Sequence, residues 1–442
     1  MIHSFLKYLL LTLATLALSE SPSLSQRALS LDECCRMALQ TDEELVKASN
    51  ARIRASLDSK NATAAMTPQL DASANVFALF PDMDVMGMSL QMRGAYSAGL
   101  SLSQPLFVGG KIIVGRKMAA IGEDCAELQQ RQKRSEVVAD VHRAYWTLVA
   151  VREKVRLLQT VMQQLDTLSS VTRRSVDAGL ATSVDLLRLD SKISEMSYNL
   201  RKAESGQRLC EMLLCSRIGL PIEESVTPSD TVISSEVVPS LSTDVSLRPE
   251  LLLLEKNVLV KEYDVKMQRA ELMPTIALAA AFNRYGNIKV NGMTQDATGN
   301  YIPFTQKYGG NIGLVALTAQ IPLWHGGQQN RNMRKARTLA DDARLELDRS
   351  RRLLTLQAQQ AAQNLADCQD LVKSARTSAT LADQTLSQMT LRYDSGLSPL
   401  TDLLDARTAW QQSRSNLIEA LTNLRIAETD YLLSVGLLPV AE

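Results

Sequence analysis

The second half of this chain repeats the first half over more than a hundred residues without a gap. The segment SQPLFVGGK at residues 103–111 returns as QIPLWHGGQ at residues 320–328, at an offset of 217 in the numbering. The same offset relates three further pairs: Gly179-Leu180 and Gly396-Leu397, Asp185 and Asp402, Gly219-Leu220 and Gly436-Leu437. Upstream, Pro68 matches Pro274 at an offset of 206, so one short insertion separates the two registers. A long duplication means that one structural unit is used twice, and two copies are too few for an ordinary solenoid. We therefore expect pseudo-symmetry inside a larger ring.

The N-terminus has the pattern of a cleaved secretory signal. His3 and Lys7 precede an apolar run from Tyr8 to Leu18 that is too short for a membrane-spanning helix. We expect residues 1–25 to be removed and the mature chain to be exported. No later stretch approaches about 20 uninterrupted apolar residues, so any membrane-spanning segment must be a β-strand. The 48 Lys and Arg residues balance the 48 Asp and Glu residues, which gives no indication of a nucleic-acid partner.

The six cysteines allow two interpretations in an exported chain. They stand at positions 34, 35, 125, 210, 215 and 368. Secreted proteins often form disulfides, but free cysteine is also among the most buried residue types, and the second interpretation is favoured here. Cys34 is a poor candidate for a lipid anchor, because it follows Glu33 far beyond the apolar run. The three histidines have no metal-ligand spacing, so neither a metal nor another cofactor is expected.

Each copy opens with a helix that ends at a proline. We expect these helices from Leu31 to about Thr67 and from Leu247 to about Met273, because the prolines that follow cannot continue a helix. Period-two alternation of apolar with small or polar residues comes next. It predicts two strands of about ten residues around a loop in each copy. We place these β-hairpins at residues 69–105, with a Met/Gly-rich loop, and at residues 275–322.

The strand pattern fits two environments. Its apolar members are Leu70, Ala72, Ala74, Val76, Ala78, Phe80, Tyr96, Ala98, Leu100 and Leu102 in copy one, and Ile276, Leu278, Ala280, Phe282, Gly313, Val315, Leu317, Ala319 and Ile321 in copy two. Tilted strands of about ten residues cross a bilayer and alternate in this way. A soluble hairpin with one wet face alternates identically, so periodicity alone does not separate the two.

The segment after each hairpin predicts a long helix with a coiled-coil seam. No proline stands between Pro105 and Pro221 or between Pro322 and Pro399. Residues 111–176 would form a helix about 100 Å long at a rise of about 1.5 Å per residue. Apolar residues follow a strict 4-3-4-3 spacing at Val137, Val141, Ala144, Leu148, Val151, Val155, Leu158, Met162 and Leu165, and in copy two at Leu354, Ala358, Ala361, Leu365, Cys368, Val372, Ala375, Ala379 and Ala382. Such a stripe holds helices together and does no chemistry.

Both long helices, at residues 111–176 and 328–393, end at the same kind of turn. Gly179 and Gly396 supply the permissive backbone that a chain reversal needs. A second helix with apolar residues at heptad spacing then returns, at residues 183–217 and 400–434. The prolines and serines of residues 222–246 indicate a linker. The first repeat would therefore span residues 26–221, and the second would span residues 247–439.

Four strands per chain constrain the assembly. Four strands cannot close a barrel, and an open sheet edge is not tolerated in lipid. If these strands span a membrane, several chains must pool them. Two chains would give eight strands and a filled interior, and three chains would give twelve strands and room for a lumen. This argues for an oligomeric tube, β in the membrane and α below it.

Taken together, these features resemble the TolC-type outer-membrane efflux proteins. The resemblance rests on the signal peptide, the duplicated unit, the strand exits PLFVGG and PLWHGG, the long helices, and the Gly-Leu turns followed by Asp-Leu-Leu. It implies a mixed α and β fold, a trimeric channel-tunnel. A twelve-stranded transmembrane β-barrel, with four strands per chain, would continue into a long periplasmic α-helical coiled-coil barrel.

The resemblance also implies a function and partners. The homotrimer would be the exit duct of a tripartite efflux pump or a type I secretion system, passing small molecules or proteins. It would sit in the lipid of the Gram-negative outer membrane and extend into the periplasm. Its partners would be a periplasmic adaptor (membrane fusion) protein and an inner-membrane transporter of RND or ABC type. The turn residues Gly179, Leu180, Gly396 and Leu397 would contact the adaptor.

The family closes its periplasmic end with a polar network at the helical turns. Matched by position, copy two supplies Tyr393, Asp402 and Asp405, and copy one supplies Asp185. Asp402 and Asp405 share one helix face, so three chains would place six carboxylates around one constriction. A first-turn carboxylate is equally explained by the helix dipole, an alternative that stays open for Asp185 and Asp402.

This chain departs from the family pattern at one gate position. Ser398 stands where an arginine partner is expected in copy two. Arg188, the copy-one equivalent of Asp405, is the candidate that could replace it.

The chain is not expected to be an enzyme, because it has no phosphate loop, no metal cluster and no Ser/His/Asp grouping on loops. The alternative function is a structural, periplasm-spanning coiled-coil envelope protein without a conduit. That alternative leaves the four alternating strands without a use.

Overall fold

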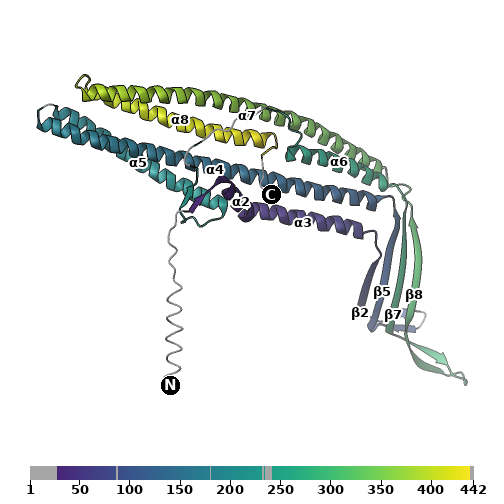
Figure 1. Ribbon diagram of the computed structural model, residues 1–442. Coiled ribbons are helices and arrows are strands. Elements are labelled where there is room, and N and C mark those ends of the chain that lie inside the picture. The colour runs from purple at the N-terminus through teal and green to yellow at the C-terminus, as the bar shows by residue number, and fades with distance from the viewer. Residues whose placement is uncertain (1–26, 86–87, 180, 231–232, 234–240, 439–442) are drawn as a thin grey trace, which may run out of the picture. The chain divides into compact units, whose positions relative to one another are not determined.

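The two proline-free segments form the longest elements of the computed structural model, α4 (Lys111–Asp177) and α7 (Gln328–Asp394). Shorter helices follow each of them after a tight turn, α5 (Ser183–Ile218) and α8 (Leu400–Ser434). Figure 1 shows each pair as a helical hairpin. None of the helices in the described part of the chain combines the length and the hydrophobicity that a membrane crossing requires.

The structure describes residues 27–85, 88–179, 181–230, 233 and 241–438. The predicted signal peptide at residues 1–25 and much of the predicted linker lie outside these residues. The chain divides into two compact units. Unit 1 comprises Met1–Ser49, Leu128–Leu252 and Arg349–Glu442, and unit 2 comprises Asn50–Glu127 and Leu253–Asp348.

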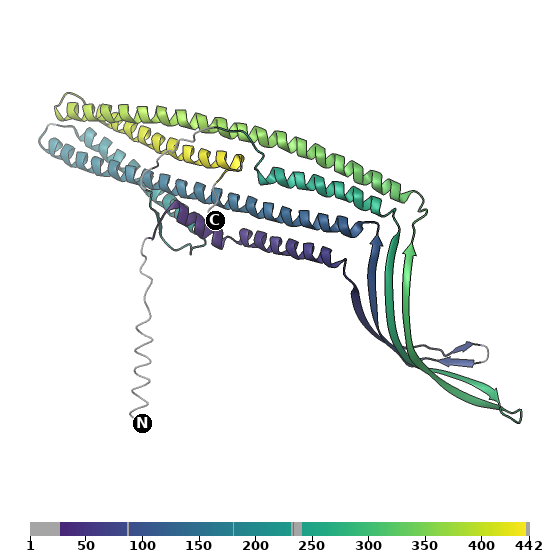
Figure 2. The same cartoon turned by 45° about the vertical axis from the view of Figure 1, so that its right-hand side comes forward.

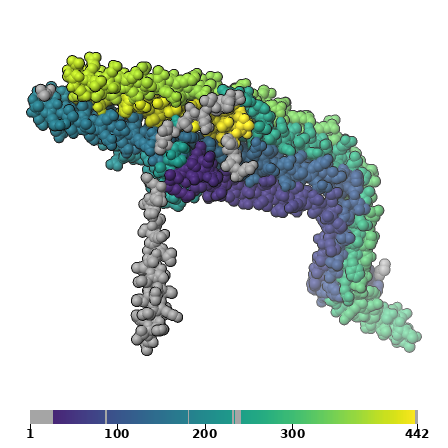
Figure 3. Space-filling view, in the orientation of Figure 1, coloured from purple at the N-terminus to yellow at the C-terminus, as the bar shows by residue number. Residues whose placement is uncertain are grey.

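In unit 1 the four long helices lie side by side in the order α7, α8, α4, α5. Arg407 of α8 donates a hydrogen bond to Gln164 of α4 (3.2 Å), and Trp410 of α8 donates one to Asp383 of α7. Figure 3 shows the yellow α8 between α7 and α4. Consequently α5 and α7 are the two edge helices of unit 1.

The predicted seam residues form the contacts between these helices. Leu148 and Leu365 are both 0% exposed, and every one of the eighteen seam residues is buried or half-buried. A core near the turns joins Leu165 of α4, Leu189 and Met196 of α5, and Leu403 of α8. The prediction that this stripe packs helices together is confirmed.

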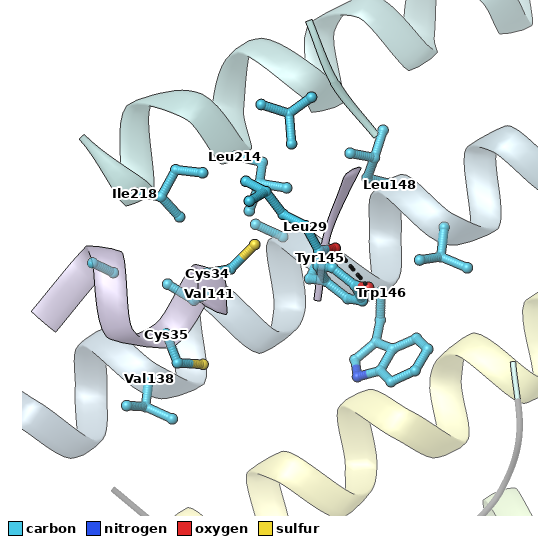
Figure 4. Packing of buried hydrophobic residues seen from close by; sticks show 14 of the residues in the cluster. Leu29, Cys34, Cys35, Val138, Val141, Tyr145, Trp146, Leu148, Leu214 and Ile218 are labelled. Atoms are coloured by element: carbon cyan, nitrogen blue, oxygen red, sulfur yellow. Dashed lines mark hydrogen bonds between the residues drawn. The ribbon is translucent and has the colours of Figure 1, made fainter. Parts of the chain in front are cut away.

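A second core of unit 1 gathers around Tyr145. Its hydroxyl donates a hydrogen bond to the carbonyl oxygen of Leu29 (3.3 Å), and Leu214 and Ile218 of α5 pack nearby (Figure 4). Cys34 and Cys35 belong to the same cluster, where burial raises the pKa of each thiol to about 12. All six cysteines are free; Cys34, Cys35, Cys215 and Cys368 are buried, and the other two are half-buried. The interpretation as buried thiols holds for these four.

Unit 2 contains an antiparallel sheet with the long strands in the order β2, β5, β7, β8 (Figure 2). Their bounds are β2 (Gln69–Ala78), β5 (Arg93–Val108), β7 (Thr275–Gln295) and β8 (Tyr301–Gln320). The pairing of β7 with β8 runs from Thr275 opposite Gln320 to Gln295 opposite Tyr301. Each of β2 and β8 has one long partner strand in the described residues, which leaves the other side of each as a sheet edge.

Two strand predictions were wrong in detail. Strands β5, β7 and β8 have 16, 21 and 20 residues, not about ten. Strands β7 and β8 are the longest because their ladder continues past the point where β7 leaves β5. The Met/Gly-rich loop of copy one contains a small hairpin, β3 (Met83–Val85) and β4 (Met88–Gln91). It forms because β4 pairs with β7 at Ser89–Gln91.

The helix predicted from Leu31 to about Thr67 is wrong in one respect, because the structure divides it into two helices, α2 (Leu31–Thr41) and α3 (Glu43–Ala64). The break is at Asp42, which has an extended backbone (ψ 120°) and accepts a hydrogen bond from the Leu45 N–H (2.8 Å). Asp42 thus caps α3, as aspartate commonly does at a helix start. Its copy-two counterpart is the single helix α6 (Pro249–Ala270). The predicted linker contains β6 (Val226–Pro228), which pairs in parallel with β1 (Arg27–Leu29).

Candidate functional site

The turn between α4 and α5 is built by glycine and a capping box. Gly179 has φ +70°, and its N–H donates to the Val176 carbonyl (3.0 Å). Thr182 is the N-cap of α5. Its hydroxyl donates to the Asp185 carboxylate (2.7 Å), and the Asp185 N–H donates back to that hydroxyl (3.2 Å). The carboxylate of Asp185 is therefore engaged in capping its own helix. Leu180 lies outside the described residues.

The turn between α7 and α8 has the same glycine but a different cap. Gly396 has φ +74°, and the Leu397 N–H donates to the Arg392 carbonyl (2.8 Å). Leu397 is 70% exposed at the tip. The N-cap of α8 is Pro399, which makes no side-chain cap bond. The carboxylate of Asp402 is therefore free of the capping role that Asp185 has.

Asp402 and Asp405 lie on the solvent side of α8. Both are exposed, while Leu400 and Leu403, which lie beside them in sequence, are 4% and 1% exposed. On a helix, residues three apart share a face, so the two carboxylates point the same way, opposite to the packed leucines. Asp402 accepts one long hydrogen bond from the neighbouring Thr401 hydroxyl (3.5 Å). This pair can present negative charge to whatever faces α8.

The other predicted gate residues are positioned separately. Tyr393 is half-buried against the core near the turns, and Arg188 is exposed on α5. Within the described part of the chain, no hydrogen bond or ion pair joins any two of Tyr393, Asp402, Asp405, Asp185 and Arg188. A gate made of these residues would therefore need contributions from neighbouring chains.

Two arginines on α8 were missed by the sequence reasoning. Arg407 lies two residues after Asp405; burial lowers the pKa of its guanidinium and nearby Asp394 opposes that shift. Arginine nevertheless stays charged in proteins. Arg414 contacts the same Asp383 carboxylate to which Trp410 donates. The sequence offered one signal for them. Arg407 and Arg414 are charged residues beside the apolar seam of α8, and their copy-one counterparts are Asp190 and Ser197.

Among the residues that the structure describes, no group of three His, Cys, Asp or Glu side chains could hold a metal ion. The arrangement consists of two glycine turns, a pair of exposed carboxylates on α8 and packed helices.

The sequence model of the outer membrane efflux protein family matches residues 35–207 and 243–436. The chain belongs to this family. The predicted resemblance is thereby confirmed, and so are the outer-membrane location and the expectation that the chain is not an enzyme. The description of the family names efflux, which belongs to the first of the two functions expected from the sequence.

Relatives include outer membrane efflux protein BepC of Brucella suis, 21% identical over 261 residues, which cover 58% of this chain and 53% of BepC. Outer membrane protein OprJ of Pseudomonas aeruginosa is 22% identical over 364 residues, 79% of this chain and 72% of OprJ. The chain spans just over half the length of the first curated relatives that it matches, 53–56%.

Solved channel structures share the fold. The Campylobacter jejuni CmeC outer membrane channel has a TM-score of 0.75 at 16% identity, covering 92% of this chain and 85% of that one. The open state of the Neisseria gonorrhoeae MtrE outer membrane channel has a TM-score of 0.75 at 18% identity, with 92% and 89% covered. The chain therefore has the fold of these outer-membrane channels, mostly helical with some sheet.

Proposed function

We propose that this protein is the outer-membrane exit duct of a tripartite efflux pump or a type I secretion system, built as a homotrimer. The observation that carries the proposal is that each unit ends in two open edges. In unit 2 these are β2 and β8, whose outward backbone groups have no partner strand in the described part of the chain. Unpaired edges are costly in lipid, so neighbouring chains must pair β8 with β2. Three copies of the four long strands would close a twelve-stranded barrel that is wide enough for a lumen.

The edge helices of unit 1 support the same closure. On α5, the most exposed large apolar side chains are Leu187, Tyr198 and Leu209, which are 65–70% exposed. They lie about two, five and eight helical turns beyond position 180. In the part of α7 nearest the turn, from residue 360 on, the exposed large apolar side chains are Leu391, Leu381 and Leu371, which are 57–65% exposed. They lie about two, four and seven helical turns before Leu397. Apolar side chains matched in this way would be buried if α5 of one chain packed on α7 of the next.

Conductance tests this function. The purified protein should be a trimer in detergent and should open discrete channels in a planar bilayer. Ala98→Pro is the disruptive variant, because Ala98 pairs with Ala74 of β2 and Arg284 of β7, and proline cannot donate in the middle of a sheet. Ala98→Val is the matched control and should conduct. A stable, water-soluble monomer that opens no channels would contradict the proposal.

The carboxylates of Asp402 and Asp405 form the proposed periplasmic gate. Six carboxylates at a narrow mouth would attract multivalent cations strongly. The channel should prefer cations and be blocked from the periplasmic side by a trivalent ion. Asp402→Ala/Asp405→Ala should remove the block and leave assembly intact, because solvated charges contribute little to folding. Asp185→Ala is the control, and it should retain the block. An equal block in the double variant would remove these residues from the gate.

Arg407 is the proposed replacement for the missing gate arginine. It follows Asp405 by two residues in the sequence, is held by Gln164 and interacts with Asp394, whereas Arg188 is exposed. A closing contact needs an oriented charge, which a half-buried guanidinium supplies. Arg407→Gln should raise the conductance of the closed state more than Arg188→Gln. The reverse order would favour Arg188.

The turn tips are the proposed contact for a periplasmic adaptor, which would link the duct to an inner-membrane transporter. Leu397 is exposed beside Gly396, and the copy-one tip has the same Gly-Leu sequence. Cysteine at position 397 should crosslink in cells to a cysteine in the adaptor's helical hairpin. Ile222→Cys, an exposed position in the predicted linker, is the control and should not crosslink. Crosslinking at 222 alone would move the docking site.

A further inference from the structure

The first turns of the two long helices carry an unusual charge distribution. Residues 111–122 of α4 contain three basic and no acidic residues, and residues 328–340 of α7 contain four basic and no acidic residues. The N-terminal end of a helix carries a partial positive charge, so acidic residues are the favoured ones there. Both repeats depart from that rule in the same place. Local helix stability therefore does not account for these side chains.

Most of these basic residues have no carboxylate partner. Lys111 lies 3.5 Å from Glu271. For Arg116, Lys117, Arg331, Arg334, Lys335 and Arg337, no ion pair is found in the part of the chain that the structure describes. All six are exposed. We name these six residues the basic collar.

Exposed apolar residues precede each half of the basic collar in the sequence. At the exit of β8, Leu323 is 90% and Trp324 is 83% exposed. At the matching exit of β5, Leu106 is 56% and Phe107 is 45% exposed. Figure 2 shows that, in unit 2, the strands leave the helices at this junction. An aromatic residue followed by basic residues is the order found where a chain passes from the hydrocarbon layer through the headgroups.

On α7 Arg334 and Arg337 lie on the exposed surface of the helix, and Lys335 lines a pocket with Asp264 and Gln268 of α6. Ala336 and Ala340 are 7% and 4% exposed. At about 100° per residue, Arg334, Lys335 and Arg337 lie on the side of the helix opposite or flanking these alanines. Arg331 also donates to the Gly326 carbonyl (3.0 Å), which ties the collar to the strand exit. From Gln328 to Arg337 the helix rises only about 14 Å, so the charges stay close to the strand ends.

We propose that the basic collar binds the anionic headgroups of phospholipids in the leaflet that faces the helices. This inference rests on the proposed function, since it requires the strands to be in a membrane. Leu323 and Trp324 would enter the edge of the bilayer, and the arginines and lysines would contact phosphates just outside it. Basic clusters next to a membrane span attract anionic lipid in this way, within about one Debye length. Three chains would carry eighteen collar residues around the tube.

The test uses quenching of Trp324 fluorescence by brominated lipids. The full-length protein is reconstituted in equimolar phosphatidylglycerol and phosphatidylcholine, with one lipid or the other carrying brominated tails. Trp324→Phe supplies the background from Trp146 and Trp410. Brominated phosphatidylglycerol should quench Trp324 at least about twofold more than brominated phosphatidylcholine, and about 1 M salt should remove the difference.

Three variants isolate the collar. Arg334→Gln/Lys335→Gln/Arg337→Gln should quench equally with both lipids, and Arg334→Lys/Lys335→Arg/Arg337→Lys should keep the preference. Lys373→Gln/Arg376→Gln/Arg392→Gln removes three exposed charges elsewhere on α7 and should also keep it. Arg331 stays in place because of its bond to Gly326.

The outcomes separate this proposal from the proposed function. Equal quenching by both lipids in a conducting wild-type channel overturns lipid binding and leaves the duct intact. An unchanged lipid preference in the glutamine variant, with altered ion selectivity, places the collar in the lumen and also overturns it. No quenching by either lipid together with no conductance rejects the duct itself.

Discussion

At the level of single residues, the duplicated sequence does not mean duplicated contacts. Asp185 and Asp402 occupy matching positions in the two copies. Asp185 is bound by the hydroxyl of Thr182, whereas Pro399 gives α8 no such cap. The carboxylate of Asp185 therefore caps its own helix, and the carboxylate of Asp402 is free of that role. The dipole explanation stays open for both, because both lie in the first turn of a helix. The N-cap residue, Thr182 in one turn and Pro399 in the other, separates a structural role from a proposed functional one.

This asymmetry predicts different effects of one substitution. Asp185→Ala removes half of a capping box and should weaken the start of α5 by about 1 kcal/mol, which is roughly a fivefold increase in local opening. Asp402→Ala should leave the start of α8 unchanged. Amide hydrogen exchange in the first turn of each helix measures the opening. An equal increase of the exchange rate in both helices would show that the capping box does not stabilise the start of α5.

His142 predicts a pH dependence of stability. Its Nδ1 lies 3.3 Å from the Thr429 hydroxyl, and burial lowers the pKa of the imidazole, with Asp32 opposing and Arg425 reinforcing the shift. A folded-state pKa below the unfolded value means that the stabilisation is complete above about pH 6.5 and is lost as the pH falls through the folded pKa. The thermal midpoint of unfolding should decrease as the pH is lowered from 7 to 5, and this decrease should be smaller in the His142→Gln variant. Parallel curves for the two proteins would exclude His142 as the source.

At the level of elements, the long helices were predictable because their signal is redundant. Heptad spacing, the absence of proline and Gly-Leu turns all indicate the same segments, and α4, α5, α7 and α8 begin and end within two residues of the expected positions. The division into repeats 26–221 and 247–439 stays a prediction. The break at Asp42 was missed, since one capping aspartate inside a helical pattern is a weak signal. Strand lengths were missed because β7 and β8 extend each other by pairing, which no local pattern encodes.

The candidate site was less predictable than the fold. Family resemblance supplied the positions of Asp402 and Asp405. Their exposure became known only from the structure, because it depends on how α8 packs on its neighbours. Arg407 could not be placed, because whether a charged residue beside a seam is exposed or held depends on the helix that faces it, here α4 with Gln164. Sequence alone therefore locates the turn but not its partners.

The seam predicts the cost of truncation on α7. Leu365 is 0% exposed, so Leu365→Ala should lower the free energy of unfolding by about 2–5 kcal/mol, the cost of lost burial plus a cavity. Lys373→Ala lies about two helical turns away, and the side chains of its ion pair with Asp370 are both 77% exposed. That control should change stability by less than about 0.5 kcal/mol. Similar losses in the two variants would mean that the stripe does not carry the packing.

At the level of the whole molecule, both units have edges that no element of the described chain covers. Among the described elements, the sheet of unit 2 has free edges at β2 and β8, and the helical layer of unit 1 has free edges at α5 and α7. The edge helices expose large apolar side chains that an isolated monomer would not be expected to leave in water. The proposed side-by-side closure of identical chains would cover both kinds of edge.

Side-by-side closure makes a geometric prediction about the edge helices. Tyr198 of α5 and Leu381 of α7 are 70% and 57% exposed. Each lies about four to five helical turns from the tip of its hairpin, so in a closed ring they should meet across each subunit boundary. Tyr198→Cys/Leu381→Cys should form intermolecular disulfides under oxidation, giving covalent dimers and a limiting covalent trimer. Tyr198→Cys/Leu353→Cys places the second thiol on the same edge but about 42 Å further along α7, beyond disulfide reach, and should stay monomeric on the gel. Each single-cysteine variant should do the same. A covalent ladder that continues past the trimer would indicate an open assembly, and no crosslink in the matched pair would mean that α5 and α7 do not meet between chains.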